Sequence, residues 1–148
     1  MFTSHDRNML RSLAQQVAEI ADLPVQAERR ELWKKHNSLQ PVRPMILLFP
    51  EGAWEELLTG ADLACEAEPA RSIEWSLRSR LYYHQHFQDD TVIEKEWIVH
   101  KAIHSTGWGM TGNHILSNEA RGAWKFDPVI KDPADLKRLR FPEISCDK

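Results

Sequence analysis

The feature that most constrains this chain is a short apolar run enclosed by prolines. Residues 45–49 read Met-Ile-Leu-Leu-Phe, Pro50 follows them, and a Pro-Val-Arg-Pro segment at 41–44 precedes them. The prolines prevent a helix from continuing into the run and hold the chain extended. Five consecutive apolar residues are too few for a helix and are typical of a strand buried on both faces, as in a parallel sheet. The run therefore predicts the first strand of an α/β fold.

Two predicted helices precede this strand. Apolar residues recur at steps of three and four over 6–22, which indicates an amphipathic helix, and a looser stripe follows over 24–38. Pro24 separates the two, because the residue before a proline avoids the helical conformation while proline suits a helix start. We therefore expect a helical hairpin over 1–40 and an α/β region over 41–148.

The rest of the chain continues this α/β reading. A third helix is predicted over 69–87, and residues 91–93 and 96–103 are rich in β-branched and aromatic types that favour strands. Residues 124–130 predict an edge strand, because a proline interrupts them. A short helix is expected to begin at Asp132, which precedes a proline at the first helical position.

Composition excludes several classes of protein. The 148 residues carry a net charge of −3, which gives no reason to expect nucleic-acid binding, and the 42% hydrophobic content with six tryptophans indicates a folded chain. No apolar run approaches the roughly 20 residues of a membrane span, and the first residues lack the pattern of a secretory signal. Cys65 and Cys146 stand far apart, outside any Cys-x-x-Cys pair. We expect a cytoplasmic protein with reduced thiols.

Histidines are the first candidates for chemistry. His100 and His104 share one face on either a strand or a helix, and His114 or Glu96 could supply a third metal ligand. The residues between His100 and His104 include no acidic base, so the His-Glu-x-x-His pattern is missing. The stronger interpretation is that both histidines face a pocket or the surface.

A glycine-rich loop is the second candidate. Residues 107–112 match Gly-x-Gly-x-x-Gly after a predicted strand, but residues 113–118 make a poor start for the helix that a dinucleotide site requires. Trp108 would also crowd the approach to such a site. A loop that faces a ligand is the better interpretation, and the sequence identifies no cofactor.

Three segments together resemble a known family. They are ERRELWKKHNSLQPVRPMILLFPE at 28–51, DDTVIEKEWIVHKAIHSTGWGM at 89–110 and DPADLKRLRFPEIS at 132–145. They resemble the N-terminal part of uroporphyrinogen decarboxylase-like proteins, and more closely the divergent bacterial branch related to corrinoid-linked methyltransferases. The resemblance covers nearly all of the chain and implies a (β/α)8 barrel. Such a barrel needs roughly 250 residues, so this chain would supply its first part.

The chain departs from the family at two points that matter for activity. True uroporphyrinogen decarboxylases carry an Arg-Gln-Ala-Gly-Arg-Tyr-like segment for the substrate carboxylates after the first strand, whereas residues 51–56 here read Glu-Gly-Ala-Trp-Glu-Glu. The methyltransferase relatives bind zinc through His and Cys residues of a C-terminal half that this sequence does not contain. The resemblance therefore implies a fragment or truncated member that is not catalytic alone.

The resemblance also suggests where a site would lie. In a completed barrel Glu51, His100, His104 and Trp108 would stand near strand ends, where they would line a pocket or position a substrate. The expected partner is a second chain that completes the barrel, or further copies in a homo-oligomer, with a small-molecule ligand and neither nucleic acid nor membrane.

The alternative is a stand-alone α+β module that binds a small molecule or another protein. Its apolar sheet face would be covered by the N-terminal hairpin or by a second copy.

Overall fold

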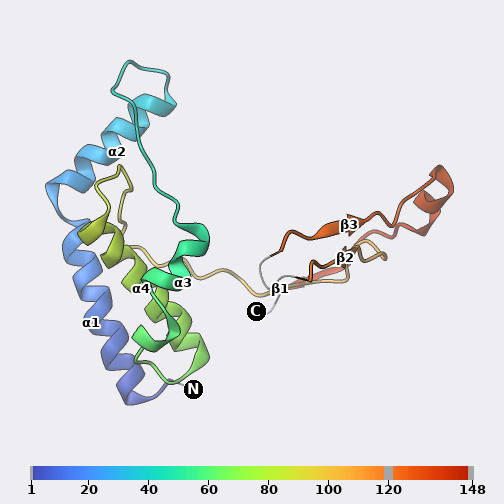
Figure 1. Ribbon diagram of the computed structural model, residues 1–148, viewed down its shortest axis with the longest axis horizontal. Coiled ribbons are helices and arrows are strands. Elements are labelled where there is room, and N and C mark those ends of the chain that lie inside the picture. Colours follow the sequence, from blue (N-terminus) through green and yellow to red (C-terminus); the bar gives the residue numbers. More distant parts are fainter. Residues whose placement is uncertain (1, 119–121, 147–148) are drawn as a thin grey trace. The chain divides into compact units, whose positions relative to one another are not determined.

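A computed structural model describes residues 2–118 and 122–146 of the chain (Figure 1). The chain divides into two compact units, Met1–Trp97 and Ile98–Lys148, and each is described by itself. The helices predicted within 1–40 are present, and the first compact unit continues beyond them to Trp97.

The first unit is helical. Its elements are α1 (Ser4–Ala21), α2 (Pro24–Asn37), α3 (Trp54–Leu57) and α4 (Glu68–His86), with single 3₁₀ turns η1 (Glu51–Ala53) and η2 (Gly60–Asp62). The three longer helices confirm the helices predicted from periodicity and proline placement. Thr3 and Asp6 form a reciprocal capping box at the start of α1, which satisfies backbone N–H groups that a helix end leaves free.

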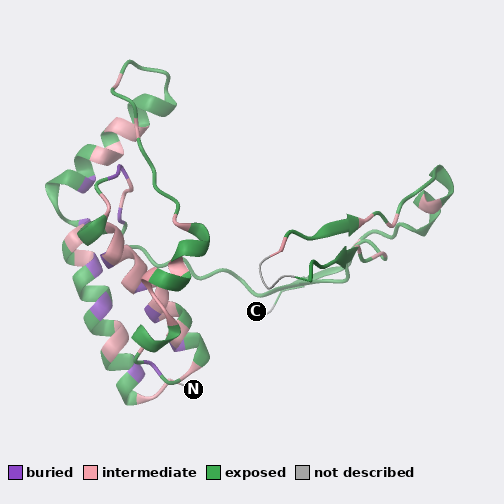
Figure 2. Cartoon of the chain, in the orientation of Figure 1, coloured by how far each residue is buried: buried purple, intermediate pink, exposed green. Residues whose placement is uncertain are grey.

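Helices α1 and α4 lie side by side and run parallel (Figure 1). Asp6 accepts a hydrogen bond from the backbone N–H of Glu66 close to where both helices begin, and Ile20 and Gln85 line one hollow close to where both end. Figure 2 shows buried residues on α1 and α4, and further buried residues on the loops beside them. The core consists of Leu13, Val17, Leu77, Leu81 and Ile93.

The prediction of an α/β barrel beginning is wrong. Residues 45–49 form no strand, and four of their five side chains are exposed. The backbone N–H groups of Ile46 and Leu48 bind the carboxylates of Asp90 and Asp89 instead of a neighbouring strand. The run is extended as predicted, but side chains take the hydrogen bonds that would build a sheet, so no parallel sheet begins here.

The second unit contains two small antiparallel sheets. Strand β1 (Ile103–Ser105) pairs with β4 (Ile144–Cys146), and β2 (Asn113–Ile115) pairs with β3 (Lys125–Asp127); a 3₁₀ helix, η3, spans Pro133–Arg138. Every pairing between the described strands is antiparallel, which again contradicts the start of a (β/α)8 barrel.

The strands predicted over 91–93 and 96–103 are largely missing. Residues 91–102 form no regular structure, and only Ile103 of the predicted span enters a strand. Lys125–Asp127 confirms the strand predicted over 124–130 only on the N-terminal side of its proline. β propensity alone does not make a strand, because a strand also needs a neighbouring strand to pair with, and the described chain places none beside residues 91–102.

None of the helices formed by the described residues is long and apolar enough to cross a membrane.

Candidate functional site

The four residues predicted to line a site lie in different units. Glu51 belongs to the first unit and opens the η1 turn with a positive φ of 48°. His100, His104 and Trp108 belong to the second unit, where all three are exposed. His104 lies in β1 opposite Ser145. The pocket role of these four residues stays a prediction.

Trp108 has defined neighbours within the second unit. Its ring lies 5.8 Å, between centroids, from the ring of Phe141, and its carbonyl oxygen accepts a hydrogen bond from the backbone N–H of Arg140. Gly107 and Gly109 on either side adopt positive φ values of 69° and 76°, which only glycine adopts readily. The loop therefore turns sharply around Trp108 and brings it to the surface.

Metal ligands do not gather in the described part of the chain. Over 2–118 and 122–146, no three His, Cys, Asp or Glu side chains converge in an arrangement that could hold a metal ion.

A network of hydrogen bonds in the first unit surrounds the extended run. The N–H of Ile46 donates to Asp90 Oδ2 at 2.9 Å, and the N–H of Leu48 donates to Asp89 Oδ2 at 3.0 Å. The N–H of Asp90 donates to the carbonyl oxygen of Ile46 at 2.8 Å, and the Tyr83 hydroxyl donates to that of Leu48 at 2.7 Å. One edge of the run is therefore fully hydrogen-bonded, as the edge of a strand would be.

Arg43 fixes the start of this edge. Its guanidinium donates from both terminal nitrogens to the carboxylate of Asp90, in the two-pronged geometry that favours arginine–carboxylate pairs. This contact, with the N–H of Ile46, lowers the pKa of Asp90 to about 2 even though burial opposes ionisation. Asp90 therefore holds the run as a charged group.

The other edge of the run is free. Successive residues of an extended chain direct their N–H and C=O groups to alternate edges. The backbone groups of Met45, Leu47 and Phe49 accordingly point away from the aspartates, and they form no hydrogen bond with any residue that the structure describes. The side chain of Phe49 is 72% exposed and that of Leu47 is 41% exposed. This free edge, residues 45, 47 and 49, is an open strand edge with apolar side chains.

A buried acid holds the loop before α4. Glu74 is fully buried; it accepts hydrogen bonds from the N–H groups of Ala64 and Cys65 at 3.0 and 2.7 Å and pairs with Arg78 at 2.8 Å. Burial by itself would raise the pKa of Glu74, but these three donors lower it to about 2. Burial raises the pKa of the Cys65 thiol to about 12, and the charge of Glu74 adds to the effect. The thiol is therefore a poor nucleophile, and the network is structural.

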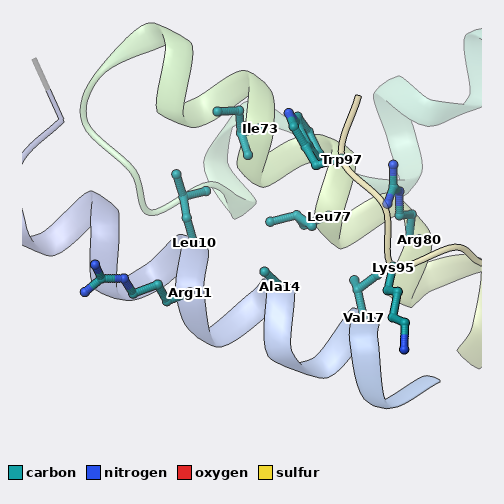
Figure 3. A pocket seen from close by; sticks show the side chains of 9 residues that line it. All are labelled: Leu10, Arg11, Ala14, Val17, Ile73, Leu77, Arg80, Lys95 and Trp97. Atoms are coloured by element: carbon teal, nitrogen blue, oxygen red, sulfur yellow. The ribbon is translucent and has the colours of Figure 1, made fainter. Parts of the chain in front are cut away.

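A groove of about 290 Å³ lies between α1 and α4 (Figure 3). Leu10, Ala14 and Leu77 lie in its middle, Arg11 lies at one end, and Arg80 and Lys95 lie at the other. The nine lining residues, Leu10, Arg11, Ala14, Val17, Ile73, Leu77, Arg80, Lys95 and Trp97, include three cations and no acid. An apolar hollow with a few charged groups is the usual form of a small-molecule site.

The three cations of the groove differ in what they already bind. Arg80 donates to the carbonyl oxygens of Glu94 and Glu96, and Lys95 pairs with Asp22 at 2.7 Å. Arg11 forms no hydrogen bond or ion pair within the described ranges 2–118 and 122–146. Arg11 is therefore the cation most available to an anionic ligand.

The second unit has no core of its own. None of its described residues, 98–118 and 122–146, is buried, although Trp108, Trp124, Phe126 and Phe141 are all large and exposed. The ring of His114 on β2 stacks on that of Trp124, the residue before β3, at 4.3 Å between centroids, although both side chains are exposed. The aromatic rings form two exposed groups, Trp108 with Phe141 and Trp124 with Phe126 and His114.

Sequence reasoning missed the acids that organise the first unit. No local sequence pattern singles out Asp89, Asp90 or Glu74, which are acidic residues of a loop and of a helix. Asp90 holds a segment more than forty residues away in sequence, a contact that no local pattern reveals. One hint of this contact is present in the sequence, because Arg43 is a charged residue between two prolines beside the apolar run.

Comparison with protein-family models, with curated proteins and with solved structures finds no match for this chain.

Proposed function

We propose that this chain is a protein-interaction module that accepts a β-strand and is not a catalyst by itself. The observation that carries the proposal is the free edge at 45, 47 and 49, whose opposite edge is held rigid by Asp89, Asp90 and Tyr83. An extended partner that adds to such an edge gains main-chain hydrogen bonds at a site that is already ordered.

One further observation supports an interaction role. The second unit buries none of its described residues, so its apolar side chains gain stability only by packing on another surface. The resemblance to uroporphyrinogen decarboxylase-like proteins, which we keep as a proposal about ancestry, would place decarboxylation or methyl transfer on residues outside this chain. A cytoplasmic location belongs to the same proposal.

Strand addition can be tested with a peptide that has a simple repeating sequence and no special side chains. The probe is a capped peptide of alternating valine and threonine with a lysine at each end, and its control is the same peptide with every backbone nitrogen methylated. We expect the amide resonances of Leu47 and Phe49 to shift on addition of the probe, while those of Ile46 and Leu48 keep their positions because aspartates hold them. Equal shifts with the methylated peptide, or none at Leu47 and Phe49, would contradict the proposal.

A second candidate function is the binding of a small amphipathic anion in the groove between α1 and α4. The observation that favours it is the lining, which combines apolar side chains with Arg11, Arg80 and Lys95 and no acid. Decanoate should therefore shift the indole resonance of Trp97, whereas decylammonium, with the same chain and the opposite charge, should not. Arg11→Gln should weaken decanoate binding, and Arg7→Gln, one turn earlier on α1 and outside the groove, should leave it unchanged. Equal binding of the two ligands would exclude an anion site.

A further inference from the structure

The groove between α1 and α4 has an arginine at each end and apolar side chains between them (Figure 3). Arg11 lies at one end and Arg80 lies at the other. We infer that the groove binds a molecule with an anionic group at each end of an apolar chain, of the class of the long α,ω-dicarboxylates. The inference rests on the second candidate function, anion binding in this groove, and adds a second charge to the ligand together with the residue that binds it.

Arg80 keeps donors free although it already forms hydrogen bonds. Both of those bonds, to the carbonyl oxygens of Glu94 and Glu96 at 3.0 and 3.3 Å, come from Nη1. Nε and Nη2 donate to no residue that the structure describes. The guanidinium carbon lies 5.5 Å from the centroid of the Trp97 ring, a cation–π contact that holds the group at the groove. Arg80 is therefore positioned for a ligand and still has N–H groups to offer it.

Lys95 does not supply the second contact. Its ammonium group pairs with the carboxylate of Asp22 at 2.7 Å, so its charge is already matched. Arg11 is exposed and forms no hydrogen bond or ion pair within the described ranges 2–118 and 122–146. Arg11 and Arg80 are therefore the two lining cations that no carboxylate of the described chain neutralises.

The spacing of the two arginines sets the length of the ligand. The lining of α1 runs from Leu10 to Val17, and that of α4 runs from Ile73 to Arg80. Each stretch advances about 10 Å along its helix, because each residue adds roughly 1.5 Å. Butanedioate is too short to span this distance, whereas decanedioate has a chain long enough to lie along the apolar side chains and reach both arginines.

A second anionic group is favoured over an apolar chain end. A ligand with one charge would place its apolar end beside the second guanidinium, which would lose hydrogen bonds to water without gaining others. A carboxylate at that end replaces those hydrogen bonds with charge-assisted ones. The methylene groups between the two carboxylates lie against Leu10, Ala14 and Leu77, where burial favours them.

Decanedioate and its monomethyl ester, which has the same chain and one charge fewer, test the inference on the full chain. Titrations followed by the indole resonance of Trp97 should give about fivefold tighter binding for the diacid, the gain expected of one partly exposed ion pair. Butanedioate should show no such advantage over its own monomethyl ester.

Arg11→Gln should remove this preference, so that decanedioate and its monomethyl ester bind with equal affinity through Arg80. The fold should not depend on Arg11, which has no polar partner in the described chain. Arg7→Gln, one turn earlier on α1 and outside the groove, is the matched control and should keep the fivefold preference.

The outcomes separate this inference from anion binding itself. Equal affinity of the diacid and its monomethyl ester for the wild-type chain overturns the inference, and so does a preference that survives Arg11→Gln. In both cases decanoate can still bind better than decylammonium, and the anion site then stands. A Trp97 resonance that responds to none of these ligands but moves with protein concentration would show that a second copy covers the groove, and would overturn both.

Discussion

Buried acids determine much of the first unit at the scale of single residues. Glu74 and Asp90 are both buried, so their carboxylates lose hydrogen bonds to water. In each case an arginine and backbone N–H groups replace those hydrogen bonds. Their pKa values of about 2 show that the charged form is the one that the fold binds. Loop residues 64–65 and the run 45–49 are therefore held by charge-assisted hydrogen bonds.

Glu74→Gln should lower the free energy of unfolding by about 1–3 kcal/mol at neutral pH, because the amide nitrogen would face N–H donors and Arg78 would lose its partner. Chemical denaturation followed by circular dichroism measures this difference. Glu68→Gln, on the same helix with a 91% exposed carboxylate, should change stability by less than about 0.5 kcal/mol.

The same substitution has a defined pH dependence. The folded pKa of Glu74 is about 2 against 4.5 for the free side chain, so the stability it contributes is complete above about pH 4.5 and is lost as the pH falls through 2. The difference between wild type and Glu74→Gln should therefore narrow across this window. A difference that stays constant from pH 7 to pH 2 would show that the charge of Glu74 is not what stabilises the loop.

At the scale of elements, local patterns predicted helices well and strands poorly. The helices predicted over 6–22, 24–38 and 69–87 appear within two residues of their expected ends, because spacing and proline position act within a few residues. The apolar run 45–49 was correctly taken as extended but wrongly as buried. Whether an extended segment joins a sheet depends on what lies beside it, and here Asp89 and Asp90 stand in that place.

The free edge could have been foreseen only in part. The sequence shows an apolar run with prolines at both ends. It does not show which edge is occupied, because that depends on the long-range contacts of Asp90 and Tyr83. The groove was likewise hidden, since it arises from the parallel packing of α1 on α4.

At the scale of the whole molecule, both units present apolar surface that their own packing leaves exposed. The first unit has a core between α1 and α4 and an open strand edge beside it, whereas the second unit orders its residues through two antiparallel sheets without burying any that are described. These two features are the basis of the proposal that the chain is an interaction module.

The most direct test of this account is amide hydrogen exchange across residues 45–49 in the full chain, diluted until it is monomeric. The account predicts an alternation: Ile46 and Leu48, bound by Asp90 and Asp89, should exchange slowly, and Met45, Leu47 and Phe49 should exchange quickly. Slow exchange at all five positions in the monomer would mean that the edge at 45, 47 and 49 is already hydrogen-bonded. This result would contradict the claim that the edge can accept a partner strand.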